Sequence, residues 1–211
     1  MKNIKKPVIL WGIAGIVLSL CTLIAAIVGM NSSPVMLADP ATATAAAEQV
    51  LECARSGNFE ELESLLSGKV QLGTVPENEE TAESLIWHAF FESIEYQVAE
   101  EVTTSDSGVA VNVHIRCLDI SQLSDSLQES APALITKIAG EKEDKTEVYD
   151  SQRNYQETFL AEVLLTATKQ ALSKNAPTTE LDMTLNLVPS KNGWQVVPSE
   201  ELLQFLTGFV A

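Results

Sequence analysis

Residues 180–197 read ELDMTLNLVPSKNGWQVV, and this stretch decides the fold. Apolar and polar side chains alternate strictly along its first half; the apolar set is Leu181, Met183, Leu185 and Leu187, and the polar set is Glu180, Asp182, Thr184 and Asn186. A period of two predicts a strand with one buried and one solvated face. Residues 190–193 read as a turn and residues 194–197 as the returning strand. The stretch therefore predicts a β-hairpin, with Trp194 as its anchor in the core.

A second pair of alternating runs lies upstream. Its apolar positions are Ile94, Tyr96, Val98 and Val102 in the first run and Val109, Val111, Val113, Ile115 and Cys117 in the second. Residues 104–108, TSDSG, predict a five-residue loop between the runs. Asn112, His114 and Arg116 fall on the opposite face of the second run and are expected to face solvent. The two hairpins together predict a curved antiparallel sheet of about four strands.

Helical periodicity fills the rest of the domain. Apolar residues at spacings of three and four predict a helical hairpin within residues 43–66, a third helix after Pro76 and two helices between residues 120 and 176. A closing helix is expected from Ser199 to Gly208. Helices in separate runs from antiparallel strands predict the α+β class, with the sheet packed against helices in one domain at residues 41–211.

The amino-terminal region reads as a membrane anchor. Residues 8–30 contain no charged side chain, and a helix of that length, about 34 Å at 1.5 Å per residue, can cross a bilayer. Lysines at positions 2, 5 and 6 predict that residues 1–7 are a cytoplasmic tail, and residues 31–40 read as a tether. We therefore expect a single-pass protein of the cell membrane whose domain lies outside the cytoplasm. Cleavage as a secretory signal, or lipidation at Cys21, are the alternatives.

Charge divides sharply along the chain. Three of the 13 basic residues precede the predicted span. The rest of the chain therefore has 10 basic and 29 acidic residues, which gives it a formal charge of −19. Such a surface repels phosphate backbones, which argues against nucleic acid as a partner. The expected partners are the membrane, through the amino-terminal helix, and a protein, peptide or small-molecule ligand. Solubility alone is the simpler explanation of the charge.

The order of elements resembles a known class of small domains. Residues 47–66, with the Gly57-Asn58 turn between two helices, the strand at residues 109–117 and the segment Gly193-Trp194-Gln195-Val196 carry this resemblance. They look like the cone-shaped α+β domains called nuclear transport factor two-like or cystatin-like, which recur behind single membrane anchors in Gram-positive bacterial surface proteins. The resemblance implies a cone-shaped fold. It implies little about activity, because some members are isomerases or dehydratases and others only bind.

Few residues are candidates for chemistry. His88, Tyr96 and Asp119 could face the inside of a cone, although Asp119 also suits the cap of the following helix. Glu92 follows His88 by four residues and could orient it. Cys53 and Cys117 fall on core faces, so they are either a disulfide or two buried free thiols. The sequence has no phosphate-binding loop, calcium loop or paired-cysteine zinc pattern, and no cofactor or metal is expected.

Two functions follow as hypotheses. The first is a non-catalytic extracytoplasmic domain that binds a ligand or protein, or supports other components of the cell envelope. The second is a small-molecule enzyme of the cone-shaped isomerase or dehydratase type that uses an acid or His88 in its cavity. The sequence offers no nucleophile with a general base beside it, which favours the non-catalytic hypothesis.

Overall fold

The computed structural model describes residues 41–72, 81–173 and 175–208. The predicted tail, span and tether, with Cys21, lie outside these ranges. Within them, no helix is both long enough and apolar enough to cross a bilayer.

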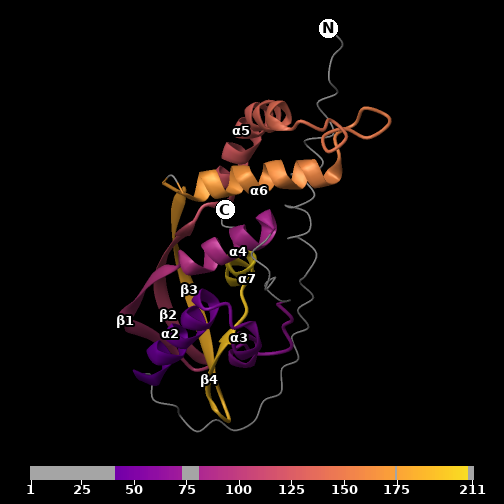
Figure 1. The fold of residues 1–211 in the computed structure, drawn as a ribbon. Coiled ribbons are helices and arrows are strands. Elements are labelled where there is room, and N and C mark those ends of the chain that lie inside the picture. Colours follow the sequence, from indigo (N-terminus) through magenta and orange to yellow (C-terminus); the bar gives the residue numbers. More distant parts are fainter. Residues whose placement is uncertain (1–40, 73–80, 174, 209–211) are drawn as a thin grey trace.

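The sheet has four antiparallel strands in the order β1-β2-β3-β4 (Figure 1). They are β1 (Glu95–Ser105), β2 (Gly108–Leu118), β3 (Thr178–Ser190) and β4 (Gly193–Val197). Both predicted hairpins are confirmed, and β2 and β3 join them into one sheet through ten paired positions from Val109–Leu187 to Leu118–Thr178. The α+β class and the four-stranded antiparallel sheet are therefore shown.

The first hairpin turn differs from the prediction. Thr104 and Ser105 pair with Val109 and Gly108, so the turn contains two residues and not five. The Ser105 hydroxyl also donates a hydrogen bond to the Gly108 carbonyl at 3.2 Å. Polar composition had suggested a loop, but ladder hydrogen bonds satisfy the backbone of these residues regardless of side-chain polarity.

Six helices are present in the described part of the chain. They are α2 (Ala41–Arg55), α3 (Phe59–Leu65), α4 (Ala82–Glu92), α5 (Ile120–Glu141), α6 (Glu157–Ser173) and α7 (Glu200–Leu206). Short polar side chains cap four of these helices. Asn58, Thr81, Asp119 and Ser199 each accept a hydrogen bond from a backbone amide in the first turn of α3, α4, α5 and α7, respectively. All the predicted helices are present, and α5 continues through Pro132. The predicted start of the third helix is wrong, because α4 begins at Ala82 after its cap at Thr81 and not directly after Pro76.

The core lies between one face of the sheet and the helices. Val111, Ile115 and Leu185 point to this face and are at most 1% exposed. Phe90 of α4 is fully buried and contacts Phe205 of α7, with 5.9 Å between their ring centroids. Helices α5 and α6 pack on each other beyond one end of the sheet (Figure 1). The alternation of apolar residues thus predicted the buried face correctly.

The last hairpin is asymmetric, because β3 has 13 residues and β4 has five. β4 pairs only with residues 186–190 of β3. Immediately after β4, Pro198 cannot donate a ladder hydrogen bond, and Ser199 caps α7, so the chain leaves the sheet. Residues 178–185 of β3 consequently have no strand partner on the side away from β2 among the described residues.

Candidate functional site

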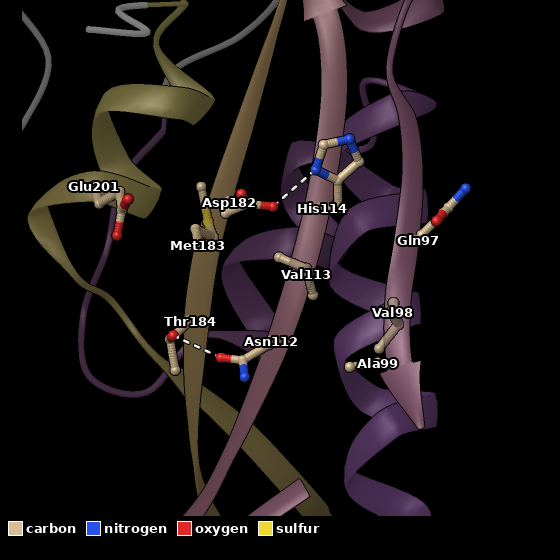
Figure 2. A pocket seen from close by; sticks show the side chains of 10 residues that line it. All are labelled: Gln97, Val98, Ala99, Asn112, Val113, His114, Asp182, Met183, Thr184 and Glu201. Atoms are coloured by element: carbon tan, nitrogen blue, oxygen red, sulfur yellow. Dashed lines mark hydrogen bonds and ion pairs between the residues drawn. The ribbon is translucent and has the colours of Figure 1, made fainter. Parts of the chain in front are cut away.

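The face of the sheet opposite the core is polar and carries a shallow groove of about 500 Å³. Three strands and the start of α7 line it, as Figure 2 shows. The lining residues are Gln97, Val98, Ala99, Asn112, Val113, His114, Asp182, Met183, Thr184 and Glu201. The groove is therefore built mainly from side chains that the strand alternation turns away from the core.

Strand register brings the polar side chains of the groove together. Gln97 pairs with His114, and His114 pairs with Asp182, so the three side chains form one row across β1, β2 and β3. Asn112 and Thr184 are paired in the adjacent row. Residues directly opposite on one face of a sheet have Cβ atoms about 5 Å apart, which lets short polar side chains bond to one another.

Two contacts connect β2 and β3 on this face (Figure 2). His114 Nδ1 lies 2.8 Å from Asp182 Oδ1, and the Thr184 hydroxyl donates a hydrogen bond of 2.8 Å to Asn112 Oδ1. The side chains of His114 and Asp182 are 44% and 88% exposed. Water screens such a pair, so it contributes little to stability and its polar atoms stay accessible to a ligand.

This arrangement suits recognition better than proton transfer. A histidine oriented by a carboxylate resembles part of a catalytic set, but nucleophilic catalysis also needs a nucleophile within hydrogen-bond reach. The one hydroxyl among the lining residues belongs to Thr184, and it already donates to Asn112. The groove offers exposed hydrogen-bonding groups and the carboxylates of Asp182 and Glu201, which favour a polar or cationic ligand.

None of the residues predicted to be catalytic lines this groove. His88 lies on α4 and is partly buried. Tyr96 lies on the core side of β1 and donates a hydrogen bond of 3.2 Å to Glu52 of α2; burial, followed by Glu52, raises the pKa of its hydroxyl. Asp119 accepts a hydrogen bond of 2.9 Å from the amide of Gln122, which confirms its predicted role as a helix cap.

Both described cysteines are buried free thiols. Cys53 lies on α2, where burial and then the nearby Glu61 raise the pKa of its thiol. Cys117 lies near the end of β2, where burial, followed by Asp119, raises the pKa of its thiol to about 11. The thiolate is the reactive form, so the folded domain keeps Cys117 unreactive near neutral pH. Of the two alternatives from the sequence, the structure has the free thiols.

The described ranges hold no cluster of three or more histidine, cysteine, aspartate or glutamate side chains that could bind a metal ion. The groove itself was missed from the sequence. His114 was placed correctly on the polar face, and Asp182 on the polar face of its own strand, but neither was linked to the other. The pattern gives the face of each residue, whereas the pairing of two strands 68 residues apart depends on register.

Comparison with known proteins identifies no relative. Neither a protein-family model, nor a curated protein, nor a solved structure matches the chain.

Proposed function

We propose that the chain is a single-pass membrane protein whose extracytoplasmic domain binds a ligand, without catalysis, on the polar face of its sheet. The observation that carries this proposal is the groove, in which exposed polar groups from three strands and the start of α7 lie together on the face of the sheet opposite the core. The uncharged stretch at residues 8–30, with lysines only on its amino-terminal side, supports the anchor and its orientation.

The same proposal includes the finer fold assignment. A helical pair at residues 41–65, a four-stranded antiparallel sheet and helices on one of its faces are in keeping with a cone-shaped, nuclear transport factor two-like domain. In that arrangement, the helices α2 and α4 fill the core side of the sheet. The ligand then uses the other side, which distinguishes this proposal from an enzyme with His88 in an internal cavity.

A cysteine introduced into the groove tests both parts of the proposal. Thr184→Cys places a thiol in the groove on β3, and Gln128→Cys places one on an exposed position of α5 as the matched control. In intact protoplasts, a membrane-impermeant maleimide is expected to label both variants of the full chain, because the domain lies outside. Relative to the purified chain in detergent, only Thr184→Cys is expected to be labelled more slowly in the native membrane, because the ligand covers it.

The labelling tests the extracytoplasmic location and the binding of a ligand in the groove separately. Labelling of both variants only after the protoplasts are lysed would contradict the extracytoplasmic location. Equal labelling of Thr184→Cys in the native membrane and in detergent, with Gln128→Cys unchanged, would contradict binding in the groove. The unmodified chain gives the background, since Cys53 and Cys117 are buried.

A further inference from the structure

The open half of β3 presents an unused strand edge beside the groove. Residues 178–185 pair with β2 in continuous register on one side and with no described strand on the other, where the start of α7 lies beside β3 (Figure 2). In an antiparallel strand, alternate backbone amides and carbonyls point to each side. Half of these groups in residues 178–185 therefore point away from β2, where an incoming strand could bond to them.

The other edge of the sheet is less suited to pairing. β1 is interrupted by a register shift between Val98 and Val102, which leaves an irregular stretch. Glu100 and Glu101 lie in this stretch and are exposed. Bulges and charged side chains are the usual means by which proteins prevent pairing at an edge strand. Only the β3 edge combines a regular ladder with direct access to the groove.

Charge indicates the kind of partner. Glu180 and Asp182 are exposed on the groove side of the open segment, and Glu201 of α7 lies across β3 from His114 (Figure 2). A second copy of this chain would place the same carboxylates against each other, which is unfavourable. A segment with lysine or arginine at every second position would instead place its cations beside these three carboxylates.

We propose that the ligand of the groove is an extended, basic peptide segment of a partner protein, which adds as a strand to residues 178–185 of β3. This inference rests on the proposed binding function and specifies the ligand class. Between its cations, the peptide presents apolar or β-branched side chains towards half-buried Leu181. Backbone hydrogen bonds hold the peptide, and the alternating cations give it specificity.

Binding of two synthetic peptides to the full chain in detergent tests this proposal. The first peptide has eight residues, with lysine alternating with valine or threonine. The second keeps the four lysines and replaces every intervening residue with proline, which cannot donate to a ladder. The strand-forming peptide is expected to bind at least about fivefold more tightly, because the proline peptide retains only the charge attraction.

Charge reversal on the protein provides the second arm. The double variant Glu180→Lys and Asp182→Lys is expected to weaken binding of the first peptide about fivefold or more. Asp125→Lys with Glu129→Lys, on exposed α5, changes the net charge equally and is expected to weaken binding by less than about twofold.

Equal affinity for the two peptides, or equal loss in the two double variants, would mean attraction by net charge alone and would overturn strand addition. Either outcome leaves the proposed function unaffected, because the labelling of Thr184→Cys tests it independently. If Thr184→Cys is protected from labelling but the strand-forming peptide binds no more tightly than the proline peptide, the groove binds a ligand of another class.

Discussion

Phe90→Ala is expected to lower the free energy of unfolding by about 3–5 kcal/mol, the range for emptying a large buried aromatic site. Phe90 is 0% exposed and contacts the rings of Trp87, Phe91 and Phe205. It thereby connects α4 with α7 beneath the sheet, and alanine would leave a cavity between the two helices. Denaturation of the full chain by urea, followed by circular dichroism, measures the loss.

An exposed aromatic residue provides the control for this substitution. Tyr149 is 36% exposed and stacks on Tyr155, with 5.2 Å between the ring centroids. Tyr149→Ala removes that pair without opening the core, so a loss of about 1 kcal/mol is expected. Losses of similar size in the two variants would show that Phe90 is not the centre of the core.

Gly108→Ala and Gly140→Ala are expected to change stability in opposite directions. A Cβ atom at Gly108 would overlap the backbone carbonyl of Leu187 on the neighbouring strand β3, and backbone cannot move aside cheaply. We expect a loss of about 1–3 kcal/mol, as for other overpacked sites. A Cβ atom at Gly140 of α5 would meet nothing within 4 Å, so alanine is expected to stabilise the helix by about 0.5–1 kcal/mol.

Thermal unfolding of the two glycine variants measures these differences. The same chemical change is made in both, so any effect on the unfolded chain is shared. A neutral or stabilising Gly108→Ala variant would mean that β2 and β3 are not in the register described, with Val109 opposite Leu187.

The alternating stretches predicted the sheet well because burial of one face imposes a period of two. Leu185 and Leu187, taken from the sequence as core residues, are each 1% exposed. Trp194 was expected to share this core, but it is only partly buried, and its indole N–H donates a hydrogen bond of 2.9 Å to the Thr42 hydroxyl. The fully buried residue of β4 is Val196.

The candidate site was harder to predict from the sequence than the sheet, because it depends on how the strands pair. His114 and Asp182 each had the correct face from the pattern, but their contact depends on the register of β2 against β3. The open edge of β3 depends on where β4 ends, and that is decided by Pro198 and the cap at Ser199. Short-range signals can suggest this ending, but only the paired strands show that residues 178–185 are left without a second neighbour.

Amide hydrogen exchange of the unliganded full chain, followed at single residues by NMR, tests the central claim most directly. In this structure, residues 178–185 of β3 pair with β2 on one side and with no described strand on the other. Residues 113–116 of β2 pair on both sides, so all their amides are expected to exchange slowly. Along residues 178–185, slow and fast amides are expected to alternate, because every second amide points away from β2. Uniformly slow exchange across residues 178–185 would show that the edge is already covered and would contradict the account.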